Sequence, residues 1–202
     1  VYDSVMSKLK HHGSILDFGC GAGRNLKYLA DHYEQVYGYD YPNMLKFVPR
    51  ETLEYKNLYL TSDYNKILDH MYDEVLFSLV LQHIHPTELR SLLEELVLHS
   101  SRFIIHSRIW VDFTFEPIAP ILADYFSIES IEYQKDPNSD IDDHFIGVFV
   151  AKLYYVIMLI ALIAKLDNTK CLCVDPKFKS FITVYAGIKA LVYVLLIIVL
   201  VK

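Results

Sequence analysis

Three glycines at alternate positions, Gly19, Gly21 and Gly23, directly follow a short apolar run in the stretch SILDFGCGAGRNL. Where a strand ends in glycines and a helix follows, the backbone of the turn can approach a ligand closely, because no Cβ intervenes. The N–H groups at the start of the helix then face that ligand. A tight strand-to-helix turn without a ligand is the alternative, but the three glycines together with Asp17 at the strand end favour a binding site.

Short apolar runs alternate with helical patterns from residue 1 to about 153, which is typical of βαβ units. We predict strands at Ser14–Phe18, Gln35–Tyr39, Leu58–Thr61, Glu74–Leu79 and Arg102–His106. Helices are predicted to begin near Gly23, Pro42, Pro86 and Glu116, the third ending at Leu98. Two further strand-like runs, Ser127–Gln134 and His144–Lys152, flank the polar stretch KDPNSDIDD, which predicts a hairpin. The expected fold is α/β, a doubly wound sheet with an antiparallel pair at one edge.

The spacing of the glycines does not fit a nicotinamide site. A dinucleotide fingerprint needs its third glycine three residues after its second, but Gly23 follows Gly21 too closely. Asp17 would also repel a phosphate, whereas its carboxylate suits a ligand that carries an ammonium or sulfonium group. A second acid, Asp40, ends the run QVYGYD at the tip of the predicted second strand. Unless it is an ordinary exposed acid, it can accept hydrogen bonds from both hydroxyls of a ribose.

These motifs resemble those of the class I S-adenosylmethionine-dependent methyltransferases over residues 1–153. LDFGCGAGRNL is similar to the family's first motif, and YGYD to the acid that ends its second strand. TSDY resembles the motif whose acid reaches the adenine, and YDEVLFSLVLQHI the motif of the fourth strand. The resemblance implies a Rossmann-like sheet of order 3-2-1-4-5-7-6. It also implies S-adenosylmethionine as the cofactor and transfer of its methyl group as the reaction.

The resemblance assigns cofactor-binding roles to residues of this chain. The methionine part would be held by one acid and three backbone segments: Asp17, Gly19, Gly21 and Gly23. The adenosine part would be bound by Asp40 at the ribose, Tyr41 and Tyr64 beside the adenine, and Asp63 at its amino group. Ser78 and Leu79 would line the floor under the methyl group. Little chain precedes the first strand, so the helix that often closes over the substrate in this family is expected to be short or missing.

Two histidines are candidate catalytic bases. Methyl transfer from a sulfonium is an in-line displacement, in which the protein supplies alignment and, for oxygen or nitrogen nucleophiles, sometimes a base. His83 and His106 both follow strands whose carboxyl ends should face the site, although either could have a purely structural role. Arg108 and Trp110 are candidate substrate contacts by position, and Cys20 is expected to pack within the loop.

The net charge of −6 makes a nucleic-acid partner unlikely, so we expect a small-molecule acceptor. The nine histidines show no HExxH or comparable spacing, so no metal site is expected. The oligomeric state is not given by the sequence. The alternative function is a catalytically silent cofactor-binding module that regulates or scaffolds a partner.

The composition changes after residue 153, which predicts a methyltransferase domain at 1–153 and a hydrophobic helical tail at 154–202. The run 181–201 is apolar except for Lys189. Its side chains favour membrane insertion on balance, and as a helix it would span about 31 Å. We therefore expect a cytoplasmic domain that 181–201 could anchor to a membrane. A packed helical appendage and an aberrant chain end are the alternatives.

Overall fold

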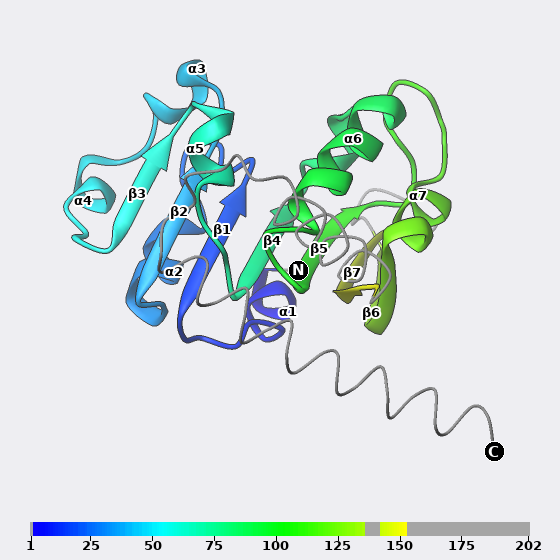
Figure 1. Ribbon diagram of the computed structural model, residues 1–202, viewed down its shortest axis with the longest axis horizontal. Coiled ribbons are helices and arrows are strands. Elements are labelled where there is room, and N and C mark those ends of the chain that lie inside the picture. Colours follow the sequence, from blue (N-terminus) through cyan, green and yellow to red (C-terminus); the bar gives the residue numbers. More distant parts are fainter. Residues whose placement is uncertain (1, 136–141, 153–202) are drawn as a thin grey trace, which may run out of the picture. The chain divides into compact units, whose positions relative to one another are not determined.

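The computed structural model describes residues 2–135 and 142–152, and they contain one seven-stranded sheet of order β3-β2-β1-β4-β5-β7-β6 (Figure 1). The strands are β1 (Ser14–Phe18), β2 (Gln35–Tyr39), β3 (Leu58–Thr61), β4 (Glu74–Ser78), β5 (Arg102–Arg108), β6 (Phe126–Lys135) and β7 (Asp142–Ala151). Strands β1 to β5 pair in parallel, and β7 pairs antiparallel with both β5 and β6. The predicted strand order and antiparallel edge are confirmed.

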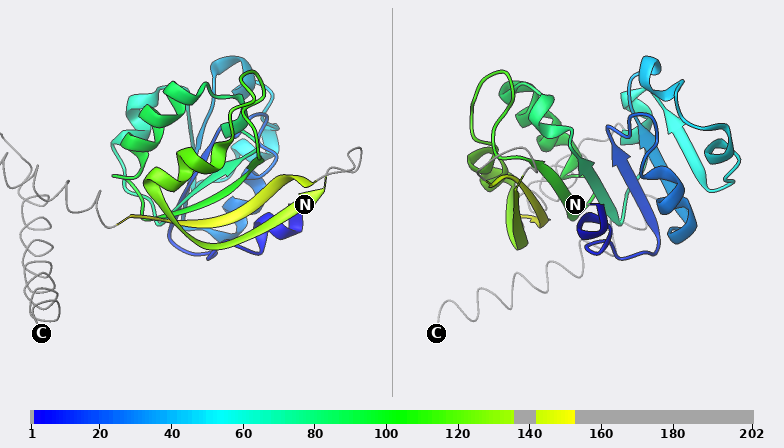
Figure 2. Two further views of the ribbon diagram at one scale, coloured as in Figure 1. Left: turned by 90° about the vertical axis from the view of Figure 1, so that its right-hand side faces the viewer. Right: turned by 180° about the vertical axis from the view of Figure 1, so that it is seen from behind.

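Helices connect the strands: α1 (Tyr2–Met6), α2 (Leu26–His32), α3 (Pro42–Leu45), α4 (Arg50–Leu53), α5 (Tyr64–Leu68), the 3-10 helix η1 (Leu81–His83), α6 (Pro86–Leu96) and α7 (Ile118–Tyr125). Helices α6 and α7 pack against each other, and the long β6–β7 pair runs along the edge of the sheet (Figure 2). Because β1 to β5 are parallel, their carboxyl ends share one edge, the upper edge in Figure 1.

The central strands read as continuous apolar runs because helices cover both of their faces. Ile15 and Leu16 of β1 are fully buried, as are Val75 to Phe77 of β4. The outermost strand, β6, is largely exposed, which fits its place at the edge of the sheet.

Several predicted element boundaries differ from the structure by a few residues, and three of them have a clear local reason. β4 ends one residue early, at Ser78, because Leu79 has a positive φ of 60° that turns the chain out of the strand. β5 continues to Arg108, because its pairing with β7 extends that far. The helix expected to begin near Gly23 begins at Leu26, since Gly23 has a φ of 84°.

The amino-terminal segment is tied to the sheet at the edge opposite the carboxyl ends, below β4 in Figure 1. Glu74 is fully buried at the start of β4, forms an ion pair with Arg102 and accepts a hydrogen bond from the Tyr33 hydroxyl. It also accepts from the backbone N–H of Lys10 at 3.0 Å, just after α1. The buried charge is therefore paired, and loss of one partner would leave an uncompensated charge in the core.

Within residues 2–135 and 142–152, no helix combines the length and apolar character needed to cross a membrane. The expected tail, including 181–201, lies outside the described residues.

Candidate functional site

The glycine loop between β1 and α2 has three positive φ angles, 73° at Gly19, 58° at Gly21 and 84° at Gly23. A Cβ at Gly19 would lie 2.5 Å from the Val80 side chain, so this glycine allows close packing of the loop after β4. A Cβ at Gly21 would meet only the methyl of Met44, at 3.9 Å. Gly21 is therefore the position where the loop backbone faces open space.

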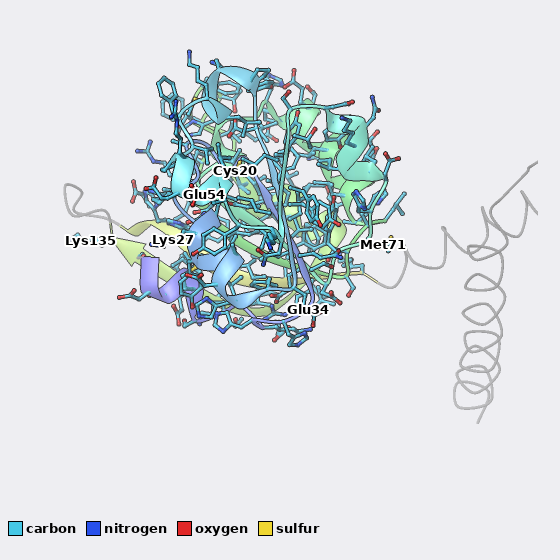
Figure 3. All side chains as sticks on the ribbon, turned by 90° about the vertical axis from the view of Figure 1, so that its left-hand side faces the viewer. Cys20, Lys27, Glu34, Glu54, Met71 and Lys135 are labelled. Atoms are coloured by element: carbon cyan, nitrogen blue, oxygen red, sulfur yellow. The ribbon has the colours of Figure 1, made fainter. Side chains whose placement is uncertain are left out.

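Cys20 lies between these glycines, is buried and belongs to the hydrophobic core (Figure 3). Burial raises the pKa of its thiol, so the side chain is a neutral packing group at neutral pH.

Asp40 lies directly after β2 and is held against the glycine loop. One carboxylate oxygen accepts a hydrogen bond from the N–H of Gly21 and the other from the N–H of Tyr41, both at 2.7 Å. Because a carboxylate offers about four acceptor sites, both oxygens can still bind hydroxyl groups.

Asp17 is fully buried at the base of the same loop. Its Oδ2 accepts a hydrogen bond of 3.4 Å from the side-chain amide of Asn25, but Oδ1 has no partner among the described residues. Burial raises the pKa of this carboxyl from 3.8 to about 7. An unpartnered buried oxygen of this kind is suited to a cationic group.

A cavity of about 620 Å³ opens at the carboxyl edge, between the ends of β1 and β2 and helix α6. Its lining consists of Phe18, Gly19, Tyr39, Asp40, Tyr41, Tyr64, Val80, His83, Ile84, Thr87, Glu88, Ser91, Leu92 and Glu95. Five residues singled out in the sequence are among them: Gly19, Asp40, Tyr41, Tyr64 and His83. Seven others lie outside the lining: Asp17, Gly21, Gly23, Asp63, Ser78, Leu79 and His106.

The residues expected around an adenine differ in whether they line the cavity. Tyr41 is 70% exposed at the cavity, and the hydroxyl of Tyr64 donates to Glu95 of α6 at 2.6 Å. Asp63 is exposed and caps α5, accepting a hydrogen bond from the N–H of Asn65 at 3.1 Å. Aspartate is a preferred residue at the start of a helix, so this role explains the presence of Asp63 without any ligand.

Leu79 adopts a left-handed conformation directly after β4, and its N–H donates to the carbonyl of His106 at 2.7 Å. Such a conformation is unfavourable for a leucine, and it is held here by the surrounding structure. The turn carries Val80 against Gly19 and starts η1 beside the cavity.

The two candidate bases have opposite environments. His83 lines the cavity, and its Nδ1 lies 3.0 Å from a carboxylate oxygen of Asp112. His106 is only 2% exposed on β5, and burial lowers the pKa of its imidazole to about 4. A neutral, enclosed imidazole is poorly placed to meet a substrate, so the structure favours His83 over His106.

Sequence reasoning missed two parts of this site. One is Asp112, which lies in the loop after β5 and is close to His83 only in the fold. The other is the wall formed by α6, whose cavity-lining residues are Thr87, Glu88, Ser91, Leu92 and Glu95. Their spacing places them on one face of the helix, a signal that was present in the sequence.

Comparison with known proteins identifies the domain. Residues 16–98 match a family model described as a methyltransferase domain, and the same seven-stranded fold is shared with solved methyltransferase structures. Residues 16–98 therefore belong to a methyltransferase domain, and the described residues share the fold of solved methyltransferases.

Three solved structures illustrate the similarity of this methyltransferase domain to known folds. The N-methyltransferase NodS from Bradyrhizobium japonicum WM9, in complex with S-adenosyl-L-homocysteine, has a TM-score of 0.61 and 14% identity, over 74% of this chain and 86% of that one. Magnesium protoporphyrin IX methyltransferase (ChlM) from Synechocystis PCC 6803 with bound SAM has a TM-score of 0.59 and 23% identity, over 74% and 76%. The PH0226 protein from Pyrococcus horikoshii OT3 has a TM-score of 0.60 and 19% identity, over 75% and 87%. Comparison with curated proteins gives no significant match.

The methyltransferase site fits S-adenosylmethionine, the cofactor of this class. The unpartnered oxygen of Asp17 suits its cationic methionine part, and the open space at Gly21 allows close approach of the backbone. Asp40 offers acceptor sites for ribose hydroxyls where β2 meets the cavity.

Proposed function

We propose that this methyltransferase domain transfers the methyl group of S-adenosylmethionine to an oxygen or nitrogen of a small-molecule acceptor. The observation that carries the proposal is that one cavity adjoins both Asp40 and Tyr41 on one side and His83 on the other. Its volume of about 620 Å³ lies within the range of roughly 300 to 1,000 Å³ that is usual for small-molecule sites.

The charge of the cavity supports the same class of acceptor. Three of its lining residues are acids, Asp40, Glu88 and Glu95, and none of the described residues that line it is Lys or Arg. An acidic wall on a chain of net charge −6 disfavours a polyphosphate such as nucleic acid. Among the similar structures, one is a methyltransferase of magnesium protoporphyrin IX, a small molecule.

Within this proposal, one group of residues binds the cofactor and another contacts the acceptor. S-adenosylmethionine, when bound, supplies the activated methyl group. Asp17, Asp40 and the glycine loop hold and orient the cofactor, which lowers the entropic cost of the displacement. The polar side chains on the opposite wall, His83, Thr87 and Ser91, are placed to orient the acceptor or receive its proton.

A turnover screen tests this proposal. The full chain is incubated with S-adenosylmethionine and small hydroxyl, amine and carboxylate acceptors, and formation of S-adenosylhomocysteine is measured against an Asp40→Ala control. We expect turnover of at least one acceptor, abolished or strongly reduced in the control. Cofactor binding without turnover of any acceptor would favour the silent regulatory module instead.

We also propose a cytoplasmic domain anchored by residues 181–201, on the basis of their apolar sequence alone. Cell fractionation with and without residues 154–202 tests it. The anchor predicts that the full chain needs detergent for extraction and that the truncated chain does not. Recovery of the full chain as a single soluble species without detergent would contradict it.

A further inference from the structure

A ring of hydrogen bonds joins η1 to the start of the loop after β5, beside the cavity. We propose that within the proposed function, on which this inference rests, Asp112 is a positioning residue that holds His83 as the proton acceptor. The acceptor substrate is then one that binds with a proton on the oxygen or nitrogen to be methylated, as a hydroxyl or an ammonium group, and loses that proton during the reaction.

The side-chain amide of Gln82 is held in one orientation. Gln82 is buried, and its Oε1 accepts hydrogen bonds from the Ser107 hydroxyl at 2.9 Å and from the backbone N–H of Arg108 at 3.2 Å. A backbone N–H can only donate, so the carbonyl oxygen of this amide must face β5. The amide NH₂ therefore faces the other way, where it lies 3.4 Å from Nε2 of His83.

This orientation determines the proton on His83. An amide NH₂ can only donate, so Nε2 of His83 must be the acceptor of that long contact. In the neutral imidazole the proton then lies on Nδ1, from which it is donated to Asp112 at 3.0 Å. The two contacts together select the Nδ1–H tautomer and keep Nε2 unprotonated, with its lone pair accepting the long contact from Gln82.

Asp112 is itself held in place by two contacts. Its backbone N–H donates to the carbonyl of Gln82 at 2.9 Å, and its second carboxylate oxygen accepts from Arg108 at 3.2 Å. The next residue, Phe113, stacks on His85 with ring centroids 5.9 Å apart. The loop is therefore fixed against η1, which keeps the carboxylate aligned with His83.

The pair of His83 and Asp112 can take up the proton that the acceptor loses when it is methylated. As the acceptor oxygen or nitrogen bonds to the methyl carbon, the carbon–sulfur bond breaks and its electron pair remains on the sulfur of S-adenosylhomocysteine. A hydroxyl passes its proton to Nε2 of His83 as it attacks, in place of the long contact from Gln82. An ammonium group passes its proton to Nε2 before it attacks, because its nitrogen has no lone pair until that N–H bond has broken. The carboxylate of Asp112 then stabilises the imidazolium through the proton on Nδ1. An acceptor that is already ionised, such as a carboxylate, has no need of this arrangement.

Nuclear magnetic resonance of the full chain, labelled with ¹⁵N, tests the pair without any acceptor. Long-range imidazole correlations at pH 8.5 report the tautomer of His83, whose signals are assigned from their loss in His83→Gln. We expect the Nδ1–H form to dominate in the wild type and to lose that preference in Asp112→Ala but not in Asp69→Ala, an exposed control. A wild-type His83 that carries its proton on Nε2 overturns the inference, and this outcome needs no Asp112 variant, only His83→Gln for the assignment.

Turnover with three probes tests the substrate class. Phenol and benzylamine carry a proton on the nucleophile at pH 7.5, whereas benzoate is ionised. We expect His83→Gln to lower kcat for phenol or benzylamine by about 10² to 10⁴-fold, with little change in KM. Asp112→Asn should lower kcat by a smaller factor and shift the lower limb of the kcat–pH profile.

From the β5 side, His83 faces Asp112, which Arg108 also contacts; from α6, Glu88 lines the same cavity, and His85 lies two residues further along the chain. Methylation of benzoate alone, or kcat unchanged in both variants, overturns the inference but leaves the proposed function standing. No turnover of any probe by a chain that binds the cofactor counts against the proposed function, and the tautomer then decides the inference on His83.

Discussion

Replacing Asp17 with Asn tests the electrostatics beneath the glycine loop. The carboxyl is fully buried, and burial raises its pKa from 3.8 to about 7. Between these two values the folded chain keeps this proton while the unfolded chain has lost it. The contribution of Asp17 to stability therefore falls as the pH rises through this window and stays low above pH 7.

The size of the effect follows from the shift. One pKa unit corresponds to about 1.4 kcal/mol, so two units between pH 5 and pH 7 amount to about 3 kcal/mol of the free energy of unfolding. Asn has nearly the shape of Asp but does not titrate. We expect Asp17→Asn to remove a fall in stability of this order between pH 5 and pH 8, and to be more stable than the wild type at pH 8.

Urea unfolding of both chains at pH 5 and pH 8, without cofactor, measures this difference. Asp69→Asn, a change at an exposed carboxyl, is the matched control and should follow the wild type. The same Asp17→Asn chain should bind S-adenosylmethionine less tightly, since a partner for its cationic part is lost. Equal pH dependence in wild type and Asp17→Asn would refute the reasoning.

Three further outcomes are expected from the site. Asp40→Ala should weaken binding of S-adenosylmethionine by about 1.5 to 3 kcal/mol in calorimetry, because charge-assisted hydrogen bonds are lost. Gly21→Val should weaken it at least as much, since φ is 58° and the side chain would occupy the open space. Burial lowers the pKa of His106 from 6.5 to about 4, so its contribution to stability is present above pH 6.5 and lost as the pH falls toward 4. His106→Gln should remove that acid-side loss in urea unfolding.

The strands near the site were predictable because their signals are local. β1, β2 and β3 have the predicted bounds, since each is an apolar run that ends at glycine, an acid or a polar turn. The short helices α4 and α5 were not predicted, because a single turn is too short to show a period. The positive φ of Leu79 has no signal in its own side chain, since it depends on the hydrogen bond to His106.

The candidate site was predictable where it follows strand ends and not where it depends on the fold. Asp40 comes directly after β2 and His83 ends the 3-10 helix that follows β4, and both line the cavity. Asp112 reaches His83 across a loop that the sequence does not position. Likewise, His106 was expected at a strand end, but β5 continues to Arg108 and His106 is buried within the strand, outside the lining of the cavity.

Calorimetric titration of the full chain with S-adenosylmethionine, with Asp40→Ala as control and NAD as the competing ligand, tests the central claim most directly. The fit of Asp17, Gly21 and Asp40 to this cofactor predicts binding in the micromolar range, weakened in the control, and no heat with NAD. Heat with NAD and none with S-adenosylmethionine would contradict the account.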